Sequence, residues 1–583
     1  MLHTLTRSLR ENKGPALVTV LLSALEVVFE IVIPLFMSNL IDFGIEGGSM
    51  AAVWKFGAFL LLLAAFQLAT GVLAARIAAR ASVGFAANLR EDMYNNVQTF
   101  AFSNIDKFST ASIVTRLTTD TTNVQNAFQM LMRMAIRSPV MLIFSMIVSF
   151  RISRDISMTF LIILPILALA LFFIIRSVFP IFSRVFRTYD ELNNVVQENV
   201  RGIRVVKSFN QERHEIGKFG AISERIYKDF SKGERLITLN APLMQFCIYT
   251  CMIVISWLGA KAIIASGNDP ALGLTTGNLT ALITYAMQIL SSLMMLSMVF
   301  AMLTISLSSA RRIAEVLEER TDIPQPAQPV MTVRDGAVDF DHVSFVYASK
   351  ADKKVLDDID LHIRSGETIG IIGGTGASKS SLVQLIPRLY DVTGGKLTLG
   401  GVDVRDYDLD TLRGAVAMVL QKNELFSGTI AENLRWGNEN ATDEQLRHAC
   451  KLACADGFIS AMPDGYDTHI EQGGTNVSGG QKQRLCIARA LLKKPKVLIL
   501  DDSTSAVDTR TDAQIQQALS TYIPDTTKII IAQRISSVQN ADRIVVLDDG
   551  HIDAVGSHDE LLRTCEIYRE VYESQQKGGE DDA

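Results

Sequence analysis

Six long apolar segments fill the first half of the chain, and shorter alternating segments make up the second half. The apolar segments lie near residues 15–40, 54–78, 133–151, 155–178, 238–266 and 278–306. A helix needs about 20 apolar residues to cross a bilayer, and each segment is close to that length or longer. The pattern predicts a transmembrane domain of six helices over residues 1–320.

The spacing between these segments is uneven. About 55 polar, helix-favouring residues separate the second segment from the third, and a similar number separates the fourth from the fifth. We therefore expect helices that continue well out of the membrane and turn back, with an interruption at VVKSFNQE, residues 205–212. These projections would reach a cytoplasmic partner domain. Two independent soluble inserts are the alternative, but neither link has enough apolar residues for a core of its own.

Charged residues indicate the orientation in the membrane. Arg7, Arg10 and Lys13 precede the first apolar segment, and basic residues favour the cytoplasmic side of a spanning helix. We expect a multi-pass protein of the cell membrane with its N-terminus in the cytoplasm. The long hairpins and the second half of the chain would then also lie in the cytoplasm.

Two acidic residues lie inside the first apolar segment. Glu26 and Glu30 are one helical turn apart, and a charge at membrane depth is costly unless a cavity or a partner compensates it. They are expected to face a polar cavity, with direct substrate contact or structural pairing as further possibilities. Met294, Met298 and Met302 form a stripe in the sixth segment, which we interpret as helix packing rather than as an adaptable substrate pocket.

A proline-rich segment, TDIPQPAQPVM, follows the sixth apolar segment and predicts a linker over residues 321–332. Beyond the linker, short β-rich runs alternate with amphipathic helices, which is typical of an α/β domain. We place this domain at residues 333–575. The remaining residues, 576–583, are small, polar and charged, and predict a disordered tail.

The sequence GGTGASKSS follows a short apolar strand of this domain and precedes an apolar helix. This context is the one that a phosphate-binding loop needs, because glycines and a helix N-terminus direct backbone N–H groups at an anion. Lys379 would reach the β- and γ-phosphates of ATP, and Ser380 would bind Mg²⁺. Ser378 stands where the pattern requires glycine, so binding is expected to be altered. The candidate nucleotide-binding residues of the loop are Gly373, Gly374, Thr375, Gly376, Ala377, Ser378, Lys379, Ser380 and Ser381.

A second acidic motif, KVLILDD, covers residues 496–502. Its four apolar residues predict a buried strand, and Asp501 at the strand end can hold Mg²⁺ through water. Asp502 is in the position to polarise the attacking water. A general base must lie within about 3 Å of its proton donor or act through one water.

Together with NVSGGQ, residues 476–481, these motifs resemble those of half-size ABC exporters of the multidrug type, and the resemblance covers residues 1 to about 575. It implies a six-helix transmembrane domain with long intracellular helices, followed by an α/β P-loop nucleotide-binding domain. It also implies ATP and Mg²⁺ as cofactors and a dimer in which each ATP lies between two subunits.

The resemblance assigns further residues to the ATP site. Tyr347 matches the aromatic residue that stacks on adenine, and Gln421 matches the glutamine that joins the γ-phosphate side and Mg²⁺ to the membrane helices. The segment from Ser505 to Asp508 resembles the loop at the dimer interface. Ser478, Gly479, Gly480 and Gln481 match the signature that clamps the ATP of the opposite subunit.

Three positions depart from the family pattern. Ser378 replaces glycine, Asp502 replaces a glutamate that is one methylene longer, and Gln533 replaces the switch histidine. All three belong to the ATP site built on this chain's own phosphate loop, whereas the signature serves the other site. The chain therefore resembles the degenerate-site subunit of bacterial heterodimeric multidrug exporters, with a second exporter half as its partner.

Composition and charge limit the alternatives. The hydrophobic content is 48%, and the net charge of −6 gives no reason to expect nucleic-acid binding. The six cysteines lack zinc-like spacing and are interpreted as reduced thiols. Six spans exclude a soluble ABC protein. Export of amphipathic drugs or lipids is the leading function, and an exporter-fold importer, for example of siderophores, or a non-hydrolysing regulatory subunit remains open.

Overall fold

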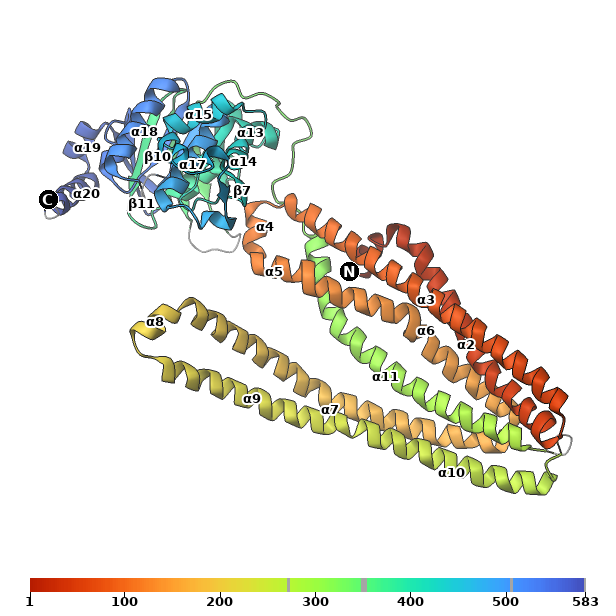
Figure 1. The fold of residues 1–583 in the computed structure, drawn as a ribbon. Coiled ribbons are helices and arrows are strands. Elements are labelled where there is room, and N and C mark those ends of the chain that lie inside the picture. The colour runs from red at the N-terminus through yellow and green to blue at the C-terminus, as the bar shows by residue number, and fades with distance from the viewer. Residues whose placement is uncertain (270–272, 348–353, 504–506, 581–583) are drawn as a thin grey trace. The chain divides into compact units, whose positions relative to one another are not determined.

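The computed structural model describes residues 1–269, 273–347, 354–503 and 507–580, and it divides into two units (Figure 1). The first unit comprises Met1–Gln98 and Thr110–Glu319. The second unit begins at Arg320 and also includes Thr99–Ser109, which is a segment between two of the apolar helices. The tip of the first long hairpin thus folds with the second half of the chain.

The first unit is helical. Its helices are α1 (Leu2–Arg7), α2 (Lys13–Asn39), α3 (Met50–Gln98), α5 (Thr110–Thr115), α6 (Thr121–Ile152), α7 (Arg154–Arg201), α8 (Ile203–Ser208), α9 (Glu212–Thr238), α10 (Asn240–Ser266) and α11 (Thr276–Glu318), with a 3₁₀ turn η1 (Arg10–Asn12) and π-helical segments η2 (Leu40–Glu46) and η3 (Arg116–Asp120). Among the residues that the structure describes, six helical stretches are long and apolar enough to span a membrane, which confirms the six predicted spans. Their lengths of 37 to 55 residues exceed the roughly 20 that a bilayer requires, so each continues into water.

The second long hairpin consists of α7 and α9, which run side by side with α8 at their tip (Figure 1). Buried Val185 and Val195 of α7 pack against Ile222 and Ile226 of α9. The predicted interruption after residue 205 corresponds to α8 and the turn that follows it. Phe209 in this turn is 70% exposed, so the described chain leaves an aromatic side chain uncovered at the hairpin tip.

The two acidic residues of α2 are paired with one arginine of α6. Arg137 donates through Nη1 to Glu26 Oε1 at 2.8 Å and through Nη2 to Glu30 Oε2 at 2.7 Å. The structure shows the structural pairing, in which a third side chain offsets the cost of two charges at membrane depth. The cavity-facing role stays a prediction, because the side chains of Glu30 and Arg137 are 24% and 35% exposed. One guanidinium and two carboxylates leave one net negative charge.

The methionine stripe is only partly covered by the helices of this chain. Met294 and Met298 of α11 are 41% and 61% exposed. The interpretation of the stripe as helix packing stays a prediction.

The second unit is an α/β domain. Its strands are β1 (Val338–Phe345), β2 (Leu356–Ile363), β3 (Thr368–Gly373), β4 (Gly394–Leu399), β5 (Val402–Asp403), β6 (Val416–Val419), β7 (Gly428–Thr429), β8 (His469–Ile470), β9 (Val497–Asp501), β10 (Thr527–Ile531), β11 (Arg543–Asp548) and β12 (His551–Gly556). Its helices are α4 (Phe102–Lys107), α12 (Lys379–Leu385), α13 (Leu409–Ala415), α14 (Ile430–Arg435), α15 (Asp443–Leu452), α16 (Asp456–Ser460), α17 (Gly479–Leu492), α18 (Thr509–Tyr522), α19 (His558–Thr564) and α20 (Glu566–Glu580), with 3₁₀ turns η4 (Gly465–Asp467), η5 (Gln472–Gly474) and η6 (Ile535–Ser537).

Two main sheets organise this unit. The larger sheet has the strand order β12-β11-β3-β10-β9-β6, in which only β12 pairs in antiparallel orientation. The smaller sheet is antiparallel and has the order β2-β1-β4-β5. The central strands β9 and β10 are buried at every position, which matches the continuous apolar runs of a sheet that is covered on both faces.

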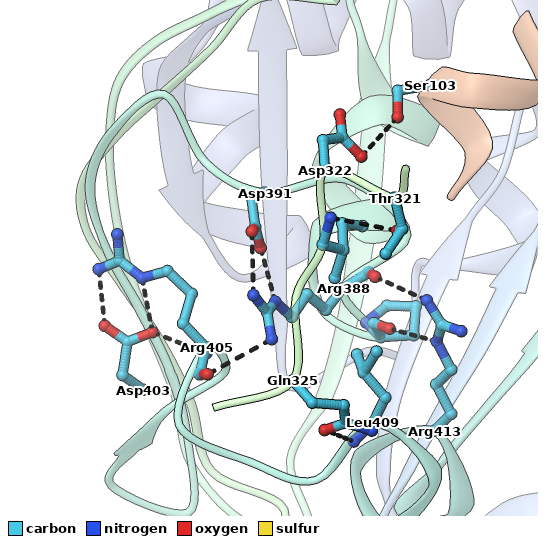
Figure 2. A network of polar contacts seen from close by, with 12 residues as sticks. Ser103, Thr321, Asp322, Gln325, Arg388, Asp391, Asp403, Arg405, Leu409 and Arg413 are labelled. Carbon is cyan, nitrogen blue, oxygen red and sulfur yellow. Dashed lines mark hydrogen bonds and ion pairs between the residues drawn. The ribbon is translucent and has the colours of Figure 1, made fainter. Parts of the chain in front are cut away.

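The linker is fixed to the second unit by polar contacts, several of which are shown in Figure 2. Ser103 of α4 donates to Asp322 at 2.7 Å, and Gln325 contacts the backbone N–H of Leu409 at 3.3 Å. The buried Arg388 donates to Asp391 and to the carbonyl of Arg405, which holds the neighbouring loop in place. The proline-rich segment that the sequence predicts to be a linker is thus part of the folded second unit.

The C-terminal helix is longer than the sequence suggests. Helix α20 continues to Glu580, past residue 576, where the composition predicts a disordered tail. Tyr568 in its first turn is completely buried and anchors the helix in the domain core.

The ion cluster in α2 and α6 yields a stability prediction. Arg137→Met leaves Glu26 and Glu30 without their counter-ion. It should lower the free energy of unfolding by about 3 kcal/mol, and with it the melting temperature in detergent. Arg133→Met is the matched control, because Arg133 lies one turn earlier and forms no ion pair with any described residue. Adding Glu26→Gln and Glu30→Gln to Arg137→Met should restore most of the loss. Equal destabilisation by both arginine variants, without rescue, would contradict this assignment.

Candidate functional site

The candidate site lies where four neighbouring parallel strands end. In the order β3, β10, β9, β6, these strands lead into Gly374, Ala532, Asp502 and Leu420. Ile531 of β10 pairs with Ile371 on one side and with Asp501 on the other, so these strand ends are level. In open parallel sheets, ligands bind beyond the carboxyl ends of the strands. Sheet pairing therefore gathers residues that lie far apart in the sequence.

The phosphate loop provides open space and a cation. A Cβ added at Gly374 or Gly376 would meet no atom within 4 Å, and Gly376 has the φ of +89° that glycine tolerates best. Lys379 donates through Nζ to the carbonyls of Gly373 and Gly374 at 2.8 and 2.9 Å. Burial lowers the pKa of Lys379, and the carboxylates of Asp501 and Asp502 oppose that shift. A loop with this open space and this cation fits a phosphate group.

Ser378 adopts a left-handed backbone conformation with φ +67° and ψ +22°. Glycine tolerates this conformation freely, whereas other L-residues pay roughly 1–2 kcal/mol for it. The serine therefore strains the loop in addition to adding a side chain to it. Thr375 is exposed at the loop surface, and Ala377 is buried beneath it.

Ser380 and Asp501 form the candidate Mg²⁺ site. The Ser380 hydroxyl donates to Asp501 Oδ1 at 3.0 Å, and burial raises the pKa of the Asp501 carboxyl. A hydroxyl and a carboxylate are the hard oxygen ligands that Mg²⁺ prefers, usually together with water and substrate phosphates. No group of three or more His, Cys, Asp or Glu side chains in the described residues could hold a metal by itself.

Asp502 is the centre of the predicted catalytic group. Its Oδ2 atom accepts a hydrogen bond from Gln533 Nε2 at 2.7 Å and another from Gln421 Nε2 at 3.2 Å. The carboxylate is buried, and its backbone is left-handed with φ +48°. The structure thus brings together the three residues that the sequence proposes for catalysis, and it directs both amides at the same oxygen.

Tyr347 lies beside the phosphate loop. Its hydroxyl is 2.7 Å from Ser381 Oγ, and its ring makes an edge contact with Tyr390, with centroids 5.1 Å apart. Tyr390 donates to Asp106 of α4 at 2.8 Å. Sequence reasoning missed this link, because neither Asp106 nor Tyr390 belongs to a recognisable motif.

The signature residues begin a separate helix. Ser478 caps α17: its hydroxyl accepts from Gln481 N at 3.3 Å, and Gln481 Oε1 accepts from Ser478 N at 2.9 Å. Ser478 and Gly479 are exposed, and within the described residues no hydrogen bond joins this segment to the phosphate loop. Ser505 lies outside the described residues, whereas Asp508 caps α18 by accepting from Thr511 N at 2.9 Å.

Comparisons with known proteins agree with this arrangement. Residues 16–294 match the family described as ABC transporter transmembrane region, and residues 356–505 match the family described as ABC transporter. The chain is 35% identical over 561 residues to the ABC transporter ATP-binding protein YfiB of Bacillus subtilis strain 168, with 96% of each chain covered. The chain belongs to the ABC transporter family. It is also 33% identical to Rv1273c of Mycobacterium tuberculosis strain H37Rv, with 99% of this chain and 98% of the relative covered.

A solved structure supports the fold assignment. The structure of a bacterial Atm1-family ABC exporter with ATP bound matches with a TM-score of 0.82 at 24% identity, covering 97% of this chain and 99% of the other. The predicted fold, six transmembrane helices followed by a nucleotide-binding domain, is confirmed. This ABC chain is a multi-pass membrane protein and an ATP-hydrolysing transporter, and it has the fold of an ABC exporter. The roles of the individual site residues stay predictions.

The strained phosphate loop yields a binding prediction. Ser378→Gly should remove the left-handed strain and the side chain, and thereby tighten ATP binding at this chain's own loop by roughly fivefold, which corresponds to about 1 kcal/mol. Ser378→Ala removes the hydroxyl but keeps the strain, so it should give little gain. Titration with a fluorescent ATP analogue measures both. An equal gain from both variants would assign the effect to the hydroxyl instead.

Proposed function

We propose that this chain is one half of a heterodimeric exporter that moves amphipathic drugs or lipids out of the cytoplasm across the cell membrane. Its own ATP site is slow, and its signature completes a competent site on the partner chain. Two observations together carry this proposal. Gln421 and Gln533 both donate a hydrogen bond to one oxygen of Asp502, and the signature at Ser478 is intact and exposed.

The geometry around Asp502 supports a slow site. A general base must accept a proton from a water about 3 Å away, and an aspartate reaches roughly 1.5 Å less far than a glutamate. Oδ2 already accepts from two amides, so water must compete with both donors for that oxygen. Losing about 1 Å of reach can cost 10²-fold in rate.

Gln533 supports the same conclusion through its chemistry. A carboxamide can donate a hydrogen bond to a phosphate oxygen, but it carries no charge and has no titratable proton near neutral pH. In this structure its donor is directed at Asp502. Gln533 can thus hydrogen-bond to a nucleotide phosphate or to the Asp502 carboxylate, but it lacks the protonation change that a histidine provides.

The signature helix supports a role at the other site. Helix α17 has 14 residues, and its N-terminal backbone N–H groups favour an anion. Ser478 and Gly479 are exposed at this end, where a phosphate of a second chain's nucleotide could be bound. Nothing in this segment departs from the family pattern, in contrast to Ser378, Asp502 and Gln533.

The membrane unit supports a hydrophobic or amphipathic substrate. Helix α11 exposes Met294, Met298 and Phe300, which are adaptable or aromatic apolar side chains. The cluster of Glu26, Glu30 and Arg137 adds one net negative charge to the helices of the membrane unit.

Vesicles that contain both chains test the proposal: ATP-dependent accumulation of an amphipathic dye in inverted vesicles is expected. Accumulation only in right-side-out vesicles would indicate import, and no transport would indicate a regulatory subunit.

The assignment of the two sites leads to a kinetic prediction. Ser478→Ala should lower the steady-state ATPase rate of the complex more than tenfold, because it removes a donor from the competent site. Asp502→Ala should lower the rate less than twofold, because its site contributes little turnover. Phosphate release from the purified complex measures both. A larger loss from Asp502→Ala would mean that the two sites are assigned the wrong way round.

A gain-of-function variant tests the cause of the slow site. Asp502→Glu combined with Gln533→His should raise hydrolysis at this chain's loop at least tenfold, because it restores the reach of the base and a titratable switch. The measurement uses a complex whose partner lacks its own catalytic carboxylate. Asp502→Asn combined with Gln533→His is the control, because it restores the histidine without a base. Equal rates in the two variants would contradict the role given to Asp502.

A further inference from the structure

A glutamine of the C-terminal helix holds the backbone beside the site. Gln575 of α20 donates through Nε2 to the carbonyl of Gln533 at 2.8 Å, and its Oε1 accepts from Ile535 N at 2.9 Å. Arg534, between these two residues, is extended with φ −97° and ψ +128°. One carboxamide thus contacts the backbone on both sides of a single residue.

This two-point contact follows from elementary geometry. In an extended segment the carbonyl of one residue and the N–H of the residue two positions later face the same side. A glutamine carboxamide presents a donor and an acceptor in one plane, so it can satisfy both groups as a neighbouring strand would. Gln575 therefore restrains the direction of the backbone that carries Gln533, in addition to contacting it.

The helix that carries Gln575 is itself anchored. The hydroxyl of the fully buried Tyr568 is 2.7 Å from His558 Nδ1, and the ring of Tyr572 lies 5.4 Å from the His558 ring. Gln575 follows Tyr572 by three residues and Tyr568 by seven, which places all three on one helix face. The domain core thus fixes the position of the carboxamide.

The other side of the restrained segment reaches the site. The Gln533 side chain donates to Asp502 Oδ2 at 2.7 Å. Ile535 is 1% exposed, and Ser537 donates to Asp512 of α18 at 2.6 Å, so the turn η6 is held between α18 and α20. A continuous set of contacts leads from the C-terminal helix through Gln533 to the catalytic carboxylate.

We propose that Gln575 is a positioning residue for Gln533, and that the C-terminal helix thereby sets how firmly this chain's site retains a nucleotide phosphate. This inference rests on the proposed function in assigning Gln533 to the γ-phosphate side of the site and in the two-chain complex used to measure nucleotide release. Loss of the Gln575 contacts frees the backbone of residues 533–535, so the Gln533 carboxamide no longer has a fixed position.

The experiment uses the full two-chain complex with Gln575→Ala, and Gln576→Ala as the matched control. Gln576 is the next residue of the same helix and donates to the Tyr572 hydroxyl. The first readout is hydrogen–deuterium exchange of the peptide over residues 533–538 without nucleotide. The second is the release rate of a fluorescent ATP analogue from complexes whose partner carries a disabled phosphate loop.

Gln575→Ala should accelerate both exchange and release by about fivefold, because both hydrogen bonds to the backbone of Gln533 and Ile535 are lost, with an unchanged melting temperature. Gln576→Ala should change neither. Gln575→Glu keeps the acceptor for Ile535 but places a carboxylate against the Gln533 carbonyl, so it should release nucleotide at least as fast as Gln575→Ala.

Three results would overturn the proposal. They are unchanged exchange and release in Gln575→Ala, faster exchange with unchanged release, or equal effects of Gln576→Ala and Gln575→Ala. The exchange readout contains no nucleotide and does not depend on which site is slow. A competent site on this chain would instead appear as high ATPase turnover of the isolated chain, so failure of the proposed function is recognised separately.

Discussion

Parallel pairing of β3, β10, β9 and β6 is the constraint on which the candidate site depends. The ladder aligns Ile371, Ile531 and Asp501 at one level, so the loops that follow these strands begin side by side. Every strand of this group is almost entirely buried, and a slip by one residue would exchange the side chains that pack on the two covered faces of the sheet. The alignment is therefore rigid, and it lets amides from two different loops reach the single carboxylate of Asp502.

The membrane unit is subject to a different constraint. Without water in the hydrocarbon region, charges must be compensated by other side chains, and Arg137 does this for both acids of α2. The same cluster explains why α2 and α6 keep costly residues at membrane depth. Helical stretches about two to three times as long as a bilayer requires continue into water, where α8 and the Thr99–Ser109 segment form the hairpin tips.

The second unit contains more of the chain than its sequence motifs suggest. Helix α4 lies between two membrane-spanning helices in the sequence, yet it folds with the nucleotide-binding domain through Asp106 and Tyr390. Tyr390 also contacts Tyr347, which the family resemblance places at the adenine. Tyr390 thus contacts both the residue expected at the adenine and the tip of the first long hairpin. The buried Arg388 donates to Asp391 and fixes the loop beside Tyr390.

The sequence by itself determined the six spanning helices, the α/β domain and the residues around the phosphate loop. These features depend on local patterns: the length of apolar runs, glycine spacing, and acids at the end of a buried strand. It also indicated Ser378, Asp502 and Gln533 as departures, because each falls inside a recognisable motif.

Only the tertiary structure decided which side chains compensate each other. Arg137 lies more than a hundred residues from Glu26, Gln575 lies about 40 residues from Gln533, and no local pattern links either pair. The composition of residues 576–583 predicts a disordered tail, whereas helix α20, which Tyr568 and Gln575 anchor to the folded domain, extends to Glu580. Such pairings depend on how helices and strands pack in three dimensions, and side-chain chemistry alone does not specify them.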